Sequence, residues 1–358
     1  MSGNTIGKMF KLTTFGESHC VAVGGIIDGM PSKIEIDRQF IQNEINRRKT
    51  GQSAISSQRK EVDNIEILSG IFEDKTLGTP IAFLVKNSDQ ISKDYDHLKD
   101  VFRPSHGDFT YQKKYGHRDY RGGGRASARE TLVRVAGGAF AKTFLKTKGI
   151  SIMAYVSQIG NIGLEKNLDD LDLRKTENSK VRCPDKKTSE RMISYLDEIK
   201  AEGDTCGGII NCIISACPPG LGEPVFDKLN ADLAKAIMSI NAVKAFEYGS
   251  GFASAAMKGS EHNDSFVFKN NKISTETNNS GGIQAGISNG EDIFFRVAFK
   301  PIPSIMKKHN VIDKNGKITS IEGKGRHDVC VVPRAVPIVE AMAAIIITDH
   351  YLRYQAYV

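Results

Sequence analysis

Apolar and polar residues recur along the chain with two different periods, which predict strands and helices in mixed order. The segments with a strand pattern are 6–15, 21–28, 65–68, 80–86, 150–162, 206–216 and 293–300. The segments with helical spacing of apolar residues are 38–48, 128–149, 187–201, 226–240 and 335–353. Because the strands mostly occur in pairs and do not alternate strictly with helices, the pattern predicts an α+β fold with antiparallel sheets.

The last predicted helix, 335–353, is apolar on nearly every face at its centre. Such a helix has to be covered on all sides, either by its own domain or by a neighbouring subunit. Its most apolar run, 336–348, contains Pro337 and Glu340, and it is too short and too interrupted to span a bilayer. We therefore expect no membrane association.

Positive charge gathers between Arg103 and Thr131, in and after a long segment, 87–125, that is predicted to be irregular. Three glycines, Gly122–Gly124, lead into a predicted helix start, where Ser127 is the expected N-cap and Glu130 the partner in a capping box. A helix N-terminus offers free N–H groups to an anion, and guanidinium groups bind oxyanions in pairs of hydrogen bonds. The stretch predicts a site for a polyanionic small molecule; a solvated basic loop is the alternative.

Composition narrows the class of protein. The 358 residues are 40% hydrophobic and 25% charged, with a net charge of +7, which is typical of a soluble globular protein with an anionic ligand. No nucleic-acid motif occurs, so we expect no nucleic-acid partner. The six cysteines form no CxxC pair, and Cys212 and Cys217 lie in apolar runs, so we expect buried thiols. The N-terminus lacks the apolar core of a signal peptide, and we expect a cytoplasmic protein.

Three segments combine small residues with ionisable ones at the ends of predicted elements. They are GESHC (residues 16–20), the stretch 103–131 and GKGRHD (residues 323–328). If they converge, His19 and His106 are two candidate acids or bases, and Asp328 is a carboxylate beside several anion-binding arginines. Each also has a plain structural interpretation: His19 as a hydrogen-bonded histidine, and Asp328 as half of an ion pair. A Ser-His-Asp hydrolase fits poorly, since no GxSxG motif exists, and no cluster of metal ligands is found.

Longer motifs in the same places resemble the chorismate synthase family. GESHC with GGIIDGMP (24–31) is similar to its first signature, GRASARET with VRVAGGA (124–139) to its second, and GRHDVCVVPRAVPIVEA (325–341) to its third. RPSHGDFTYQKKYG, SINAVKAFEYGSGF and FKPIPS also match, so the resemblance covers nearly the whole chain. It implies one domain over residues 1–358, a β-α-β sandwich with helices between antiparallel sheets, and a homotetramer.

The resemblance also implies a reaction and a cofactor. The family removes phosphate and a C6 hydrogen from 5-enolpyruvylshikimate 3-phosphate by anti-1,4-elimination, giving chorismate, and it needs reduced FMN although no net redox change occurs. No GxGxxG nicotinamide-binding unit is found, so we expect an external flavin reductase rather than the protein's own use of NADPH. The alternative is a non-catalytic flavin- or polyanion-binding protein of the same fold.

Roles follow from the matching motif positions. The resemblance implies that His19 protonates the departing phosphate and that His106 lies by the flavin and protonates or stabilises its reduced form. It also implies that Asp328 assists the flavin N5 in removing the C6 proton, together with Ser18 and Ser127. The implied substrate-binding residues are Arg48, Arg103, Arg129 and Arg326. The implied flavin-binding residues are Arg125, Ala126, Ser127, Asn241, Ala242, Ala285, Lys300, Pro301, Ile302, Pro303, Ser304 and Arg326.

The chain departs from the family pattern at three positions. Ala54 stands where some members carry a substrate-binding arginine, and Gln58 or Arg59 is a candidate to compensate. Ala126 replaces a common serine, a change that a backbone contact would survive. Cys20 stands where glycine is also common, and we expect it to have a packing role.

Overall fold

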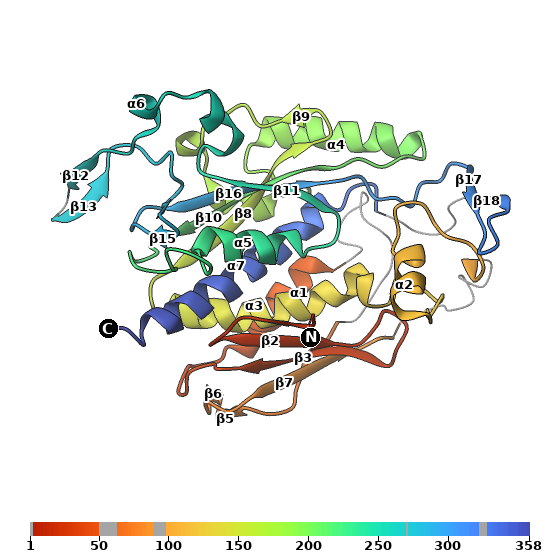
Figure 1. The fold of residues 1–358 in the computed structure, drawn as a ribbon, viewed down its shortest axis with the longest axis horizontal. Helices are drawn as coiled ribbons and strands as arrows, with labels where there is room; N and C mark the ends of the chain where they lie inside the picture. The colour runs from red at the N-terminus through yellow and green to blue at the C-terminus, as the bar shows by residue number, and fades with distance from the viewer. Residues whose placement is uncertain (1–2, 50–62, 89–97, 270, 322–327) are drawn as a thin grey trace.

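The computed structural model describes residues 3–49, 63–88, 98–269, 271–321 and 328–358, and it shows two five-stranded sheets with a layer of helices between them (Figure 1). Every strand pair in both sheets is antiparallel. The predicted α+β class, with helices between antiparallel sheets, is confirmed.

The first sheet has the strand order β1-β2-β3-β7-β4. Its strands are β1 (Thr5–Ile6), β2 (Lys11–Phe15), β3 (Ala22–Asp28), β4 (Glu66–Ile67) and β7 (Ile81–Lys86). The prediction of one strand over 6–15 is wrong, because the chain turns back between β1 and β2. The turn is held by Asp349, a buried residue of the last helix, whose Oδ1 accepts the backbone N–H groups of Lys8, Met9 and Phe10 at 2.8, 2.6 and 2.9 Å.

The second sheet has the strand order β11-β16-β10-β8-β9. Its strands are β8 (Ser151–Ile159), β9 (Ile162–Gly163), β10 (Gly208–Ser215), β11 (Val243–Tyr248) and β16 (Ile293–Phe299). The helices between the sheets are α1 (Arg38–Arg48), α3 (Thr131–Lys146), α5 (Leu229–Met238) and α7 (Val332–Tyr354), while α4 (Lys186–Ala201) lies outside this layer (Figure 1). These five helices confirm the predicted helical segments, and the side chain of Asp37 caps α1 by accepting the backbone N–H of Phe40.

Small elements complete the chain. Among the described residues, four hairpins lie outside the main sheets: β5 (Ile71–Phe72) with β6 (Lys75–Thr76), β12 (Phe266–Lys269) with β13 (Lys272–Thr275), β14 (Ile283–Gln284) with β15 (Ile287–Ser288), and β17 (His309–Ile312) with β18 (Ile318–Ile321). A short helix, α6 (Gly259–His262), precedes β12, and the β12–β13 hairpin extends away from the body of the protein (Figure 1).

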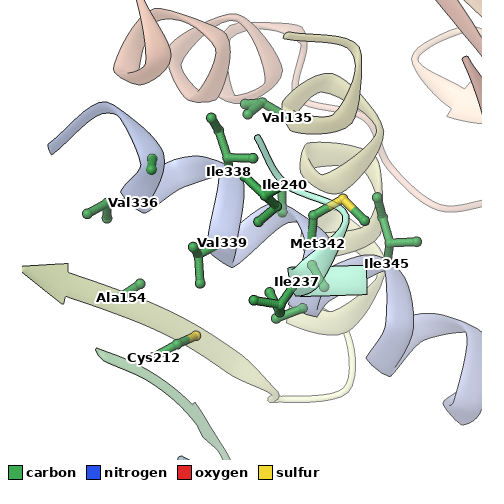
Figure 2. Packing of buried hydrophobic residues seen from close by; sticks show 14 of the residues in the cluster. Val135, Ala154, Cys212, Ile237, Ile240, Val336, Ile338, Val339, Met342 and Ile345 are labelled. Atoms are coloured by element: carbon green, nitrogen blue, oxygen red, sulfur yellow. The ribbon is translucent and has the colours of Figure 1, made fainter. Parts of the chain in front are cut away.

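The helix α7 forms the centre of the core. Its side chains Val336, Ile338, Val339, Met342 and Ile345 pack among residues of α3, α5, β8 and β10 (Figure 2). By length and composition α7 could cross a membrane, but 94% of its most apolar stretch is buried inside the protein, as in a core helix. The chain itself covers this helix. Its burial in the core, and not a short length, is therefore the reason to describe α7 as a core helix.

Buried charges join three of the central helices. Glu340 of α7 accepts hydrogen bonds from Arg47 of α1 and Lys142 of α3, both at 2.6 Å, and from the backbone N–H of Ala154 at 3.0 Å. Burial raises the pKa of Glu340, but the charges of Lys142 and Arg47 outweigh it and lower the pKa from 4.5 to about 2. Glu44 also contacts both cations, at 2.9 and 2.5 Å. The cluster fixes the C-terminal end of α1, where Arg48 follows Arg47.

Two local predictions in the basic stretch are wrong. Residues 108–115, expected to be irregular, form the helix α2 (Asp108–Tyr115). Ser127 does accept a hydrogen bond from the backbone N–H of Arg129, but it caps a 3-10 turn over 128–130, and α3 begins only at Thr131. The carboxylate of Glu130 binds Thr14 and Arg134 instead of completing a capping box.

Candidate active site

The glycine run touches the loop that carries His19. Gly122 has a φ of +142°, and a Cβ added there would lie 2.7 Å from Cδ2 of His19 and 2.9 Å from Oγ of Ser18. Only glycine allows this approach, because any side chain would overlap the imidazole. The predicted convergence of residues 16–20 with the stretch 103–131 is therefore present in the structure.

Arg125 ties the same two segments together. Its Nη1 donates to the carbonyl of Gly16 at 3.1 Å, and its Nη2 donates to Oγ1 of Thr14 at 2.6 Å. On the other side of the stretch, Nδ2 of Asn241 donates to the carbonyl of Ala126 at 2.9 Å. The predicted cofactor residues Arg125, Ala126 and Asn241 thus surround the turn that leads into α3.

His106 lies between its own loop and the segment after β16. Its Nδ1 is 2.9 Å from the carbonyl of Pro104, and its Nε2 is 3.3 Å from Oγ of Ser304. Since a carbonyl only accepts, we assign the proton of the neutral ring to Nδ1 and leave Nε2 as an acceptor. Burial and the nearby charge of Arg103 lower the pKa of His106, which favours the neutral imidazole.

The segment 300–304 meets the residues after α5. The backbone N–H of Lys300 donates to the carbonyl of Ala242 at 2.9 Å, and its Nζ donates to the carbonyl of Ser105 at 3.3 Å. Ala242 has a φ of +68°, and Ser105, next to His106, has a φ of +56°. Left-handed backbone is unfavourable for these residues and is retained where neighbouring contacts enforce it.

The segment 300–304 is itself held by a further contact. Within it, Pro301, Ile302 and Pro303 connect Lys300 to Ser304, and the carbonyl of Ile302 accepts a hydrogen bond from Thr205 at 2.7 Å.

Arg48 and Arg129 are both buried beneath the start of α3. Arg48 donates from Nη2 to the carbonyl of Ala128 at 2.6 Å and from Nε to Oγ1 of Thr131 at 3.1 Å. Arg129 donates from Nη1 to Oδ1 of Asp63 at 2.6 Å, and the other oxygen of Asp63 lies 3.9 Å from Nη1 of Arg48. One fully buried carboxylate therefore sits between the two guanidinium groups.

Arg103 is held by a carboxylate of its own. Its Nε and Nη2 both contact Asp108 at 2.7 Å, and Arg118 contacts the same carboxylate at 2.9 Å. Burial raises the pKa of Asp108, and the hydrogen bonds and charge of Arg103 more than reverse this, so that its pKa is lowered. This three-residue cluster fixes the turn that carries His106.

Asp328 joins the site through Arg334. Nη1 of Arg334 donates to the carboxylate of Asp328, which is buried, and Nε of Arg334 donates to the carbonyl of Arg48 at 3.3 Å. The third predicted segment is therefore connected through Arg334 and Arg48 to the second, at Ala128 and Thr131. The rest of that segment, including Arg326, lies outside the described residues, as do Ala54, Gln58 and Arg59.

Ala285 is not brought to this group. It lies in the turn between β14 and β15, where the carbonyl of its neighbour Gly286 accepts the N–H of Leu229, the first residue of α5. Asn241 follows the other end of α5, and a helix of 10 residues is about 15 Å long. Within the chain, Ala285 is separated from the other predicted cofactor residues by the length of that helix.

Two residues at the centre of the site have no counterpart in the predictions from sequence. Asp63 forms an ion pair with Arg129, and Oδ1 of Asn87 accepts a hydrogen bond from Nε of Arg129 at 2.8 Å. A single aspartate before one strand and a single asparagine after another form no motif, so only their contacts in the folded chain reveal them.

The donor set fits a flavin. Oγ of Ser18 and Oδ1 of Asn241 are buried polar atoms with no hydrogen-bond partner in the described part of the chain. Buried polar atoms in proteins are normally hydrogen-bonded, and a bound polar ring system would supply the missing groups. Gly122 of the glycine run lies against Ser18, and Asn241 binds the carbonyl of Ala126, which follows Arg125. Together they suit an anionic cofactor and substrate.

Comparisons with known proteins agree with this chemistry. The family model described as chorismate synthase matches residues 10–352. Proteins named chorismate synthase from Christiangramia forsetii and Cytophaga hutchinsonii are each 59% identical to the chain and are aligned over 99% of it and 98% of their own length. A solved structure titled as the crystal structure of chorismate synthase superimposes with a TM-score of 0.77 at 32% identity, covering 97% of this chain and 93% of that one.

Proposed function

The chain belongs to the chorismate synthase family, and from this premise we propose how its residues carry out the family's reaction. The protein is a lyase that converts 5-enolpyruvylshikimate 3-phosphate into chorismate in aromatic amino acid biosynthesis. The C3–O bond to phosphate breaks and the C6–H bond breaks. The C6–H electron pair becomes a ring double bond, the existing double bond shifts, and phosphate leaves with the C–O pair, so no net redox change occurs.

We assign His19 to the leaving phosphate. Its imidazole lies against Gly122, at the glycine run, where backbone N–H groups and arginines favour an anion. A phosphate leaves more easily when one of its oxygens is protonated as the bond breaks, and an imidazolium can donate that proton. The convergence of the His19 loop with the glycine run is the observation that carries this assignment.

The C6 proton requires a group on the other side of the site. We assign its removal to Asp328, with the hydroxyl groups of Ser18 and Ser127 assisting. Asp328 is buried, and its carboxylate accepts a hydrogen bond from Arg334. Arg334 also binds the backbone of Arg48, so the acceptor is fixed relative to the substrate-binding arginines.

We propose that reduced FMN is the cofactor. When bound, it supplies electron density to the substrate as the C–O bond breaks. Arg125, Asn241 and the segment from Lys300 to Ser304 would hold it. The buried Oγ of Ser18 would donate or accept the hydrogen bond it lacks, and the buried Oδ1 of Asn241 would accept one. His106 lies against Ser304 with its Nε2 as an acceptor, so we propose that it stabilises the reduced ring by accepting a hydrogen bond rather than by protonating it.

The substrate carries a phosphate and two carboxylates. We propose that Arg48 and Arg129, oriented by Asp63, bind two of these anions, with Arg326 as a further ligand. We propose that Arg103, which is bound to Asp108 through two nitrogens, contributes its charge to substrate binding and fixes the turn that carries His106.

Further properties of the family extend this proposal. We propose a cytoplasmic homotetramer, built from single-domain chains, that receives reduced flavin from an external reductase. One continuous core joins both sheets and supports a single domain. Phe266, Phe268 and Ile273 of the projecting β12–β13 hairpin are each at least 67% exposed, which suits a contact between copies.

The test uses purified protein with chemically reduced FMN and substrate in the absence of oxygen. Chorismate should form with reduced but not with oxidised FMN. Flavin binding without turnover would reject the proposal in favour of a non-catalytic flavin-binding protein. Repeating the assay under air with oxidised FMN and NADPH tests the external reductase, since activity there would show that the protein reduces its own flavin.

A further inference from the structure

The side chain of Asn87 bridges the His19 loop and Arg129. Asn87 follows the last residue of β7, and its backbone N–H donates to the carbonyl of Val21 at 2.9 Å. Its Nδ2 donates to the carbonyl of Glu17 at 3.1 Å and to the carbonyl of Cys20 at 2.8 Å. These carbonyls lie on either side of Ser18 and His19, so one amide group clamps both ends of the turn that presents the imidazole.

The orientation of this amide is determined by its partners. Arg129 has only donors, and its Nε lies 2.8 Å from Oδ1 of Asn87. The two backbone carbonyls have only acceptors, so they require the NH2 group. With Oδ1 towards Arg129 and Nδ2 towards the carbonyls, both ends of the Asn87 amide have suitable partners. After a flip of the amide, donors would face donors and acceptors would face acceptors. Asparagine is the residue of this size that supplies an acceptor on one side and two donors on the other.

Arg129 is itself fixed at three nitrogens. Besides Asn87, it donates to Asp63 at 2.6 Å and to the carbonyl of Lys86 at 3.2 Å. The series Asp63, Arg129, Asn87 and the His19 turn is thus a continuous chain of hydrogen bonds through buried or half-buried groups. It connects a proposed substrate-binding arginine with the proposed acid.

We propose that Asn87 is a positioning residue that holds His19 in reach of the departing phosphate, an inference that rests on the proposed role of His19. Gly122 limits the imidazole on one side, and the clamp by Asn87 limits the turn on the other. Proton donation requires hydrogen-bond geometry, and a displacement of about 1 Å can cost on the order of 10²-fold in rate. Loss of the clamp should therefore lower kcat rather than substrate affinity.

Two substitutions distinguish the contact of Asn87 with Arg129 from its contacts with the His19 turn. Asn87→Asp keeps an acceptor for Arg129 but sets a carboxylate against the carbonyls of Glu17 and Cys20. Asn87→Ala removes both ends. If the clamp on the His19 turn matters, both variants lose roughly 10–100-fold in kcat, with substrate KM changed by less than about 3-fold. If only the contact to Arg129 matters, Asn87→Asp stays close to the wild type.

The pH profile adds a signature that a structural residue would not produce. A general acid must be protonated, so kcat falls at high pH as the acid loses its proton. This fall is the alkaline limb of the pH profile. A new carboxylate at position 87 favours the protonated imidazole of His19, which moves this limb to higher pH in Asn87→Asp. Asn87→Ala carries no charge and should leave the limb where it is.

Asn211 provides the matched control. It is also half-buried and bridges two side chains, donating to Tyr155 at 3.2 Å and accepting from Ser157 at 2.8 Å, but it lies in the middle of β10. Asn211→Ala should keep wild-type kcat and pH profile. Wild-type kcat in Asn87→Ala, an unshifted limb in Asn87→Asp, or failure of both variants to fold would each overturn the positioning role.

His19→Gln distinguishes this failure from failure of the proposed function. If His19→Gln is inactive while the Asn87 variants resemble the wild type, only the positioning role is lost. If His19→Gln turns over normally, His19 is not the acid, and the inference falls with that assignment.

Discussion

Neutralising Glu340 should strongly destabilise the protein. This carboxylate is buried in the core and lies 2.6 Å from both Arg47 and Lys142. In Glu340→Gln the side chain keeps its size and its acceptor for the N–H of Ala154, but Arg47 and Lys142 then share the carboxylate of Glu44, and Arg47 keeps a second partner in Glu177. Removing one partner from a buried ion pair costs about 3–5 kcal/mol.

The lowered pKa of Glu340 leads to a similar value for the stability that its charge contributes. A shift from 4.5 to about 2 corresponds to roughly 3 kcal/mol of stability at neutral pH, at about 1.4 kcal/mol for each pKa unit. Because the folded-state pKa is depressed, this stabilisation is present above pH 4.5 and is lost as the pH falls towards 2. The wild type should therefore lose stability over that range more steeply than Glu340→Gln.

Urea denaturation at equal protomer concentration measures the difference, since assembly makes stability concentration-dependent. Glu165→Gln is the control, because Glu165 pairs with Arg191 on the surface with 81% of its side chain exposed. It should change the free energy of unfolding by less than about 1 kcal/mol. A Glu340→Gln variant within about 1 kcal/mol of the wild type at pH 7, or a difference that does not shrink on acidification, would refute the reasoning.

Two further predictions concern the site. His106→Ala should lower turnover by at least ~100-fold, the usual scale for a positioned acid or base, in steady-state assays with reduced FMN; turnover near that of the wild type would exclude the role given to His106. Arg48→Ala should raise substrate KM by roughly 10–100-fold, as expected for loss of a charged hydrogen bond, while FMN affinity measured by fluorescence titration changes little. An equal loss of both affinities would instead identify Arg48 as a structural residue at the end of α1.

The sequence predicted helices and strands well where apolar residues recur with a clear helical or strand period. The helices α1, α3, α4, α5 and α7 have apolar residues at helical spacing, and the strands of both sheets have compact apolar runs. The helix α2 was missed because DFTYQKKY has no apolar face. Its one buried residue, Asp108, is buried through its ion pairs with Arg103 and Arg118.

The site was predictable to the extent that its residues lie in contiguous motifs. GESHC, the glycine run and Asp328 indicated three segments as a candidate site, and the fold connects them near the start of α3. Their partners Asp63, Asn87 and Arg334 were not predictable, because each is a single polar residue whose contact lies far away in the sequence. The separation of Ala285 from Asn241 likewise depends on the path of α5, which no local pattern reveals.

The central claim is that these three segments form one site for elimination without net redox change. A single-turnover experiment with excess protein, reduced FMN and substrate, in the absence of oxygen, tests it most directly. Phosphate and chorismate should appear in equal amounts, and the flavin absorbance should show fully reduced FMN again at the end. Release of phosphate without chorismate, or reduced flavin consumed in proportion to product, would contradict the account.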